Sequence, residues 1–564
     1  MSSLLRRLCE PHLRSLLYRG APMRIVVSFA ALFAFLTVTA QVPAQNLLTA
    51  QQWREDLHYL AGQIVKTHPG AFHHITERDF SSAIADLDTR IPTLSDHQVE
   101  VELVRLVAML GEGHSRLSPP GLPDPMSDVP ELTPFKDPRL AFHRLPVQLY
   151  AFSDGLFVVG ATPNLQQLVG SEVVQIGSHP AQSALEAVQP LVNRDNDMGT
   201  LLIAPRLVVI PEVLHAMRVI ADPARVTLTL RTGEGKDITS DLSPLAIGEQ
   251  PQWVGIGEKS SRPNPVYWRH ADENLWAEYL AESKTVFVKI HVLQDSREKT
   301  VSKFAREVGS LISSSPAERF VIDLRGCHGG DNQKFRSLLL EFLRSESLNQ
   351  PGRLFVTTDR ATFSAAVNAA SDMERLSNSI LVGEPTAGSP SSWGDPAKIT
   401  LPNSGLIARI STVYWRDWTP DESRPSIAPD ISTPLSSADY FAGRDPAMDA
   451  ILQFPKPTDL GAVLENLLSM GAGLNTIERL YYQHKTDPVW ADESTEQPMQ
   501  RVGADLLSRR SYKDALTIFE INFMDYPGSL SGALEAAHAA QALNPGDAGV
   551  NNLAAALEHL KRRQ

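Results

Sequence analysis

RFVIDLRGCHGGDN, from Arg319 to Asn332, is an apolar strand that runs into a glycine-rich loop. Two more apolar runs follow, RLFVTTD (353–359) and SILVGEPTAG (379–388), and TFSAAVNAA (362–370) lies between them. The first of these runs leads into that segment, with Ser364 at the start of a predicted helix. A serine at a strand-to-helix turn can present its hydroxyl clear of the sheet, and N–H groups of a glycine loop can stabilise an oxyanion. The stretch predicts an α/β layer carrying two of the three parts of an acyl-transfer site. The third part, a base, has to come from elsewhere.

The rest of the chain divides by its apolar pattern. From Leu47 to about Leu110, apolar residues recur three and four positions apart, which predicts helices. Short runs between 144 and 252 predict strands, and alternating strands and helices from 276 to 451 predict an α/β layer structure. The predicted domains are a signal peptide (1–44), an N-terminal helical domain (45–120), a β-rich intermediate region (121–256), an α/β core (257–455) and a helical tail (456–564).

Composition narrows the class of protein. The chain has 564 residues, of which 43% are hydrophobic, so it is long enough for several domains with proper cores. A net charge of −13 provides no basic field for phosphates, which argues against nucleic acid as a partner.

The N-terminus predicts export. Several arginines precede an uncharged run, Ile25–Ala40, and VPA then ends at Ala44 as a small-residue cleavage site. A stable spanning helix needs about 20 apolar residues, so cleavage is favoured over a retained membrane anchor, and the protein is expected in the periplasm or secreted. Either Met1 or Met23 can be the start. After cleavage Cys327 is the remaining cysteine, so no intrachain disulfide is expected.

The C-terminal segments GADLLSRRSYKDALTIFEINFMDYP and ALEAAHAAQALNPGDAGVNNLAAALEHL resemble tetratricopeptide helix pairs. One or two such repeats cannot form a free-standing solenoid. Two interpretations stay open, a helical cap on the α/β core and a surface that binds a protein partner.

The candidate base is His114 in LGEGHSRL, directly after the N-terminal helices. A histidine on a glycine-broken loop is not held there by apolar packing, and its ordinary pKa suits proton transfer near neutrality. A loop histidine alone is usually unremarkable, and Ser364 alone is most simply a helix N-cap. The hypothesis rests on their combination.

GEGHS, DLRGCHGG, TFSAA, GEPTAG and APDI occur in the order found in the tail-specific (C-terminal-processing) serine proteases. From Leu47 to about Ile451 the chain resembles the branch related to tricorn protease. The resemblance implies a crotonase-like α/β core, Ser364 as nucleophile, His114 as base and no cofactor. It also implies an oxyanion hole from the Gly329 and Gly330 loop with the N–H of Ala365, and Glu422 as the residue that orients His114.

The sequence departs from that family in three places. Ser389 stands where the Ser–Lys members have their lysine, and Lys398 is too far along the chain to replace it. Cys327 and His328 replace the usual residues of the glycine loop. The spacing between Glu422 and the PD motif differs by about one residue, so Asp421 is an alternative orienting residue.

Other chemistries are weaker interpretations. His68, His73 and His74 have no carboxylate or cysteine at ligand spacing, so no metal site is expected. Cys327 beside His328 is not expected to act as a thiol nucleophile, because adjacent residues on one loop rarely orient each other. The segment SEVVQIGSHPAQSAL (171–185) resembles the hairpin and helix start of the peptide-binding module of many family members.

Two functions therefore remain. The first is an exported serine peptidase that acts on peptides or unfolded proteins. The second is a catalytically inactive binding protein on the same fold, with the helical tail as a docking surface. The presence of both Ser364 and His114 favours the peptidase.

Overall fold

The computed structural model describes residues 46–122, 137–255, 264–456, 459–488, 490 and 492–563. The predicted signal peptide, 1–44, lies outside the described residues. None of the described helices is both long and apolar enough to cross a membrane.

The N-terminal region forms helices, as the periodicity predicts. Thr49 and Gln52 form a capping box at the start of the first helix, and Ser95 and Gln98 form another at the start of the third. Gly111, with φ +69°, follows the end of the third helix in a conformation that glycine adopts without strain. These helices are α1 (Ala50–Thr67), α2 (Glu77–Arg90) and α3 (Asp96–Ala108).

The intermediate region is an antiparallel sheet accompanied by helices. Its central strands run in the order β2-β3-β4-β6-β7, with β5 beside β4 and β8 beside β3. The strands are β2 (Val147–Phe152), β3 (Gly155–Ala161), β4 (Glu172–Ile176), β5 (His179–Pro180), β6 (Val226–Arg231), β7 (Asp237–Leu242) and β8 (Val254–Gly255). The region is β-rich, as the sequence predicts, and α4 (Ala181–Val188) begins within the segment 171–185, where a helix start is expected. The helices α5 (Asp197–Leu207) and α6 (Pro211–Ala216) were not predicted.

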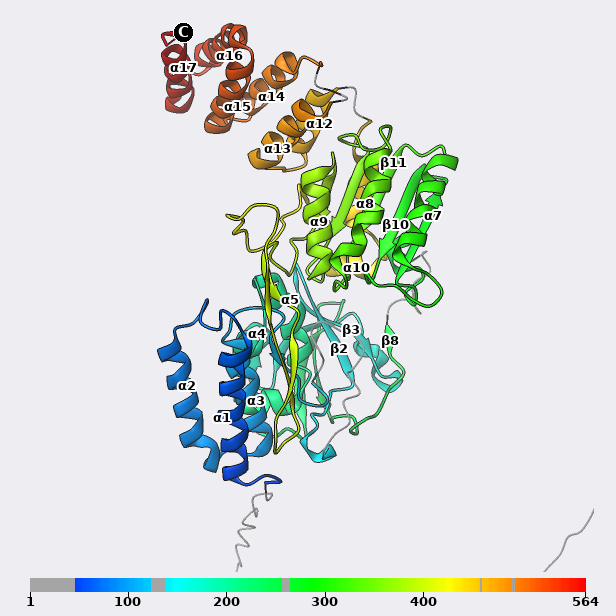
Figure 1. Ribbon diagram of the computed structural model, residues 1–564, viewed down its shortest axis with the longest axis vertical. Helices are drawn as coiled ribbons and strands as arrows, with labels where there is room; N and C mark the ends of the chain where they lie inside the picture. Colours follow the sequence, from blue (N-terminus) through cyan, green and yellow to red (C-terminus); the bar gives the residue numbers. More distant parts are fainter. Residues whose placement is uncertain are drawn as a thin grey trace, which may run out of the picture. The chain divides into compact units, whose positions relative to one another are not determined.

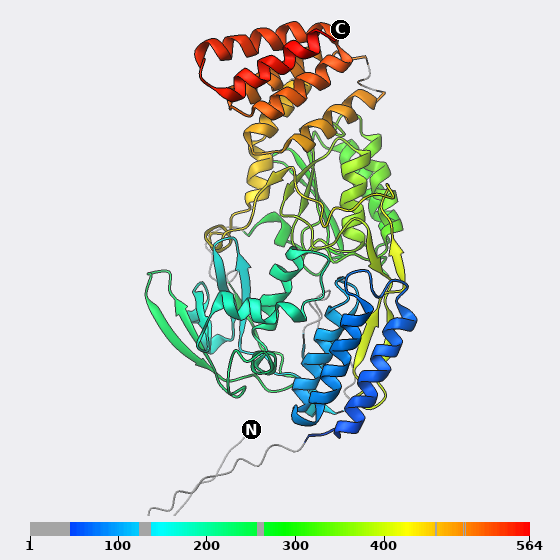
Figure 2. The same cartoon turned by 90° about the vertical axis from the view of Figure 1, so that its left-hand side faces the viewer.

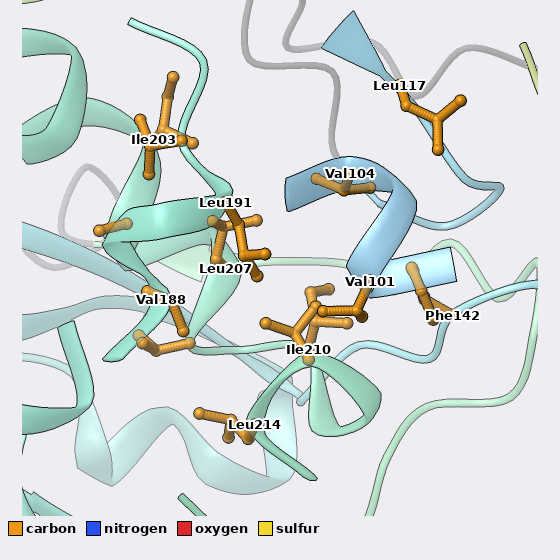
Figure 3. Packing of buried hydrophobic residues seen from close by; sticks show 14 of the residues in the cluster. Val101, Val104, Leu117, Phe142, Val188, Leu191, Ile203, Leu207, Ile210 and Leu214 are labelled. Carbon is orange, nitrogen blue, oxygen red and sulfur yellow. The ribbon is translucent and has the colours of Figure 1, made fainter. Parts of the chain in front are cut away.

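One hydrophobic core joins this region to the N-terminal helices. Figure 3 shows Val101 and Val104 of α3 among side chains from the α4–α6 segment, including Leu191 and Ile210. The burial of these apolar side chains stabilises the contact between the two regions by about 25 cal/mol for each Å² of apolar surface removed from water.

The α/β core region contains a six-stranded sheet in the order β18-β13-β12-β11-β10-β9. Every neighbouring pair is parallel except β9 with β10. Parallel sheets are usually covered on both faces, which agrees with the fully buried strands β10, β12 and β13. The strands are β9 (Leu275–Leu280), β10 (Thr285–Ile290), β11 (Arg319–Asp323), β12 (Leu354–Thr358), β13 (Ile380–Gly383) and β18 (Ile431–Ser432).

Three helices pack on one face of this sheet, as Figure 1 shows: α7 (Val301–Ser314), α8 (Phe335–Arg344) and α9 (Ala365–Leu376). Two short helices follow the last strand, α10 (Ser437–Phe441) and α11 (Pro446–Gln453). Apolar side chains of the opposite face, including Phe287 and Val321, belong to a cluster with residues of α11 and the tail helices.

Six α-helices make up most of the tail's described residues. Gly503 lies against the ring of Phe519, where a Cβ atom would come within 2.3 Å, so α14 and α15 approach closely. The helices are α12 (Leu460–Ser469), α13 (Leu474–Thr486), α14 (Glu496–Ser508), α15 (Tyr512–Asp525), α16 (Leu530–Leu543) and α17 (Ala548–Lys561). Helix pairs form where the two repeat-like segments lie, while their assignment as tetratricopeptide repeats stays a prediction.

Part of the predicted α/β core packs with the N-terminal helices instead. β15 (Ala397–Thr400) and β16 (Ile407–Ile410) pair with each other, and β16 pairs with β1 (Arg116–Leu117). Figure 2 shows these yellow strands beside the blue helices. Their buried residues, such as Ile399 and Ile410, belong to the N-terminal hydrophobic core.

Candidate active site

Ser364 occupies the N-cap position of α9 in a strained conformation. Its φ is +54° and its ψ −128°, which is uncommon for a residue with a side chain and typical of functional turns. Its side chain makes no capping hydrogen bond to the helix. The hydroxyl therefore remains available for another partner, as in a nucleophile elbow.

That partner is His114. The Nε2 atom of His114 lies 3.0 Å from Oγ of Ser364, although 250 residues separate the two in the chain. The imidazole packs on the ring of Phe363, the residue before the serine, with the centroids 4.5 Å apart. This places a possible base within hydrogen-bond reach of a possible nucleophile.

The His114 loop is held by a buried carboxylate. Glu112 accepts hydrogen bonds from the backbone N–H of His114 at 2.5 Å and of Ser115 at 2.8 Å. It also accepts one from the hydroxyl of Ser411 at 2.8 Å. Ser411 directly follows β16. The packing of β15 and β16 on the N-terminal helices therefore also helps to hold the His114 loop in place.

A second carboxylate joins the base loop to the loop beside the serine. Asp195 accepts hydrogen bonds from the N–H of Gly113 at 2.7 Å and from the N–H of Ser389 at 3.1 Å. The following residue, Asn196, donates to the carbonyls of Thr386 and Pro425 at 3.0 and 2.6 Å. Sequence reasoning missed both, because RDND in residues 194–197 carries no motif that would mark it.

The glycine loop lies directly against the serine. Gly329 has φ +110°, and a Cβ atom there would stand 2.7 Å from Cβ of Ser364. Gly330 has φ +130°, and a Cβ atom there would stand 2.4 Å from the carbonyl oxygen of Leu293. Both positions therefore require glycine.

Two backbone donors near the serine are available. Among the described residues, no acceptor is hydrogen-bonded to the N–H of Ala365 or of Gly330. Both residues line the same cavity as His114 and Ser364. The backbone N–H of Gly329 instead donates a hydrogen bond to the sulfur of Cys327.

Burial sets the charge state of the base. The pKa of His114 falls to about 4, mainly because burial desolvates the imidazole and also because Arg116 lies nearby, although Glu112, Asp395 and the Trp393 carbonyl act in the opposite direction. The imidazole is therefore neutral at pH 7 and can accept a proton. Its buried Nδ1 atom has no hydrogen-bond partner of normal geometry among the described residues.

The structure does not bring Glu422 to the base. Its carboxylate accepts hydrogen bonds from Arg375 at 2.5 Å and from Arg424 at 2.9–3.1 Å. Although burial acts to raise the pKa of Glu422, the bonds from Arg424 keep it below its ordinary value. No described hydrogen bond joins Glu422 or Asp421 to His114, so an orienting role for either stays a prediction.

The alternative chemistries find little support in the described residues. Cys327 is fully buried, and burial raises its pKa to about 11, which keeps the thiol protonated. Lys398 pairs with Arg409 across β15 and β16 and does not line the cavity of Ser364. No group of metal-binding side chains occurs among the described residues; the His68 ring packs on His73 and Trp393.

The site opens into a cavity of about 460 Å³. His114, Ser364, Ala365 and Gly330 line one part of it. Asp395, Trp415 and residues of β14 (Ser392–Gly394) line another. The arrangement provides a nucleophile, a neutral base and two backbone donors in one accessible space, which is what acyl transfer requires.

The chain matches no protein-family model and no curated protein. Its fold is similar at low identity to solved structures of processing proteases. Mature CPAF shares 12% identity over 75% of this chain and 99% of its own, with a TM-score of 0.49. The photosystem II D1 C-terminal processing protease shares 12% over 77% and 100%, with a TM-score of 0.34. Tricorn protease shares 13% over 72% of this chain and 36% of its own, also with a TM-score of 0.34.

Proposed function

We propose that the protein is a serine peptidase that cleaves peptide bonds through an acyl-enzyme. The observation that carries the proposal is the 3.0 Å contact between Nε2 of His114 and Oγ of Ser364 at the head of α9. Ala365 and Gly330 line the same cavity, and neither N–H group has an acceptor among the described residues, which supports the proposal.

In the proposed reaction, neutral His114 takes the proton of Ser364 as the hydroxyl oxygen attacks the peptide carbonyl carbon. The N–H groups of Ala365 and Gly330 stabilise the resulting oxyanion. The tetrahedral intermediate collapses, the C–N bond breaks, and His114 returns the proton to the leaving amine. Water then attacks the ester carbonyl with the same base, which releases the new carboxyl terminus and restores Ser364.

In this mechanism the backbone contacts of its loop hold the imidazole of His114 in place. Glu112 binds the N–H of His114 itself and Asp195 binds the N–H of the residue before it. A carboxylate on Nδ1 is absent among the described contacts. That absence is the one observation favouring the second candidate, a binding protein on the same fold that has lost turnover.

We further propose that the chain is exported to the periplasm or secreted, on the basis of the arginines and the apolar run before Ala44. The expected substrate is a peptide or unfolded protein. The tail helices α14–α17 are proposed to provide a surface for a protein partner, because the segments 503–527 and 533–560 resemble tetratricopeptide helix pairs.

A fluorophosphonate probe tests the central claim, since it labels an activated serine directly. Labelling and cleavage of an unfolded protein should both occur with the purified chain and vanish in Ser364→Ala. Ser310→Ala, an exposed serine on α7, is the matched control and should retain both. An unlabelled, inactive wild type that binds peptides tightly would favour the binding protein.

A further inference from the structure

One stripe of α9 runs from the candidate nucleophile to the far end of the helix. Ser364 at its N-cap is followed at intervals of four residues by Asn368, Asp372 and Leu376. Residues four apart lie on the same side of a helix, and twelve residues rise about 18 Å. These residues therefore form a row, inclined to the helix axis, that begins at the candidate nucleophile.

A groove follows this stripe. A second cavity, of about 540 Å³, shares Asn332, Asn368 and Trp415 with the cavity of the active site. Helices α8 and α9 form one wall, and the segment after β17 (Val413–Trp415) forms the other. The two cavities are therefore neighbours that share part of their lining.

Large apolar side chains stand exposed along the groove. Trp418 is 56% exposed, Leu340 of α8 49% and Leu376 of α9 39%, and Trp415 at the junction of the two cavities is 36% exposed. Four such side chains around one hollow form a patch of the kind that marks an interaction site. The indole N–H of Trp418 donates to Asp372 at 2.9 Å, which fixes its ring beside α9.

Polar groups at the start of the groove suit a polypeptide backbone. Asn332 and Asn368 line both cavities and contact each other at 3.3 Å, which leaves further donors and acceptors of their amide groups for a ligand. An extended chain advances about 3.4 Å per residue, so about five residues span the path from Ser364 to Leu376.

We propose that this groove binds the substrate polypeptide in extended form and selects a large aliphatic or aromatic side chain about four or five residues from the scissile bond. Trp418, Leu340 and Leu376 contact that side chain, while Asn332 and Asn368 bind the intervening backbone. The inference rests on the proposed peptidase function for its reference point, Ser364, and adds a selectivity that the reaction itself does not require.

The first test uses binding without turnover. Two fluorescent peptides, identical except for Leu or Ser at the selected position, are titrated into the full chain carrying Ser364→Ala. The Leu peptide should bind at least tenfold more tightly. Adding Leu376→Ser or Leu340→Ser, both exposed helix positions, should remove that difference, whereas Leu543→Ser, 81% exposed on α16, should not.

The second test uses cleavage. A randomised peptide library cut by the wild-type chain should show aliphatic and aromatic residues enriched at one distance from the cut, and Leu376→Ser should flatten that enrichment. A flat profile in the wild type, or equal binding of the two peptides, overturns the groove proposal even if peptides are cleaved. Selective binding without any cleavage overturns the peptidase proposal and leaves the groove in place.

Discussion

The carboxylate of Asp195 accepts the backbone N–H of Gly113 at 2.7 Å, immediately before the candidate base. Its other oxygen accepts the N–H of Ser389 at 3.1 Å, immediately after Gly388. Gly388 in turn packs on the nucleophile turn, where a Cβ atom would stand 3.5 Å from the N atom of Ser364. Asp195 thus links the segments that carry the base and the nucleophile, and it acts as a positioning residue.

Asp195→Asn should lower kcat about 10- to 100-fold, because an amide NH₂ cannot accept one of the two N–H groups and the imidazole is displaced. KM should change little, since Asp195 does not line the cavity. Asp197→Asn, the same change at an exposed position of α5, is the control. Equal effects of the two variants on kcat would contradict the positioning role.

The pH dependence should report Asp195 rather than His114. Burial, with the charge of Glu112 next, raises the pKa of Asp195 to about 7, whereas burial lowers that of His114 to about 4. A protonated Asp195 accepts one N–H less well, so activity should fall as the pH drops through about 7. In Asp195→Asn the acidic limb should move toward pH 4, which a pH profile of kcat/KM would show.

The same shift has a consequence for stability. The folded pKa of Asp195 lies above its unfolded value of about 3.9, so the folded state binds more protons between these values. The contribution of this group is present below about pH 4 and is lost as the pH rises through about 7. The melting temperature of Asp195→Asn relative to wild type should therefore rise from pH 5 to pH 8. A difference that is constant with pH would contradict this.

Ser364→Ala and His114→Ala should each lower turnover by about 10⁴-fold or more, and the double variant should lose little beyond either. The two groups act as one unit across their 3.0 Å contact. Initial rates on an unfolded protein, with the melting temperature checked for every variant, provide the measurement. Full activity in folded Ser364→Ala would defeat the proposal.

Gly329→Ala should abolish activity, because the new methyl group would stand 2.7 Å from Cβ of Ser364. Gly326→Ala separates this clash from backbone strain: it also has positive φ, +69°, but nothing lies within 4 Å of its Cβ position. The control should show only a loss of stability of about 1–2 kcal/mol. Equal activity of the two variants would argue against the glycine loop at the site.

Glu422→Gln and Lys398→Met distinguish the possible partners of the base. Lys398 lies outside the cavity, so its replacement should leave kcat within about twofold, as for an ordinary surface change. Glu422 pairs with Arg375 and Arg424, so its replacement should lower the melting temperature more than it lowers kcat. A loss of kcat comparable to that of His114→Ala would instead identify Glu422 as the orienting carboxylate.

The positions of Ser364 and His114 in the fold were predictable because each follows a local pattern. Ser364 stands where an apolar strand meets a helix, and His114 stands on a glycine-broken loop after a periodic helix. The helices α5 and α6 were missed because their segment, LLIAPRLVVIPEV, is apolar on nearly every side and shows no clear 3.6-residue period. Asp195 was missed for another reason, since its role depends on two N–H groups from distant loops.

The partners of Glu422 could not be predicted from its spacing in the sequence. The distance to the PD motif could suggest the carboxylate, but it could not show that Arg375 of α9 and the nearby Arg424 compete for it. The placement of β15 and β16 was likewise hidden, because their alternating pattern fits any sheet that offers an edge.

Residues 397–410 leave the α/β core and pack on the N-terminal helices. Asp56 of α1 accepts hydrogen bonds from the N–H groups of Asn403 and Ser404, and the hydroxyl of Ser411 donates to Glu112, which holds the His114 loop. A protein truncated before residue 397 would therefore keep both Ser364 and His114 but would lose one of the contacts that hold the His114 loop.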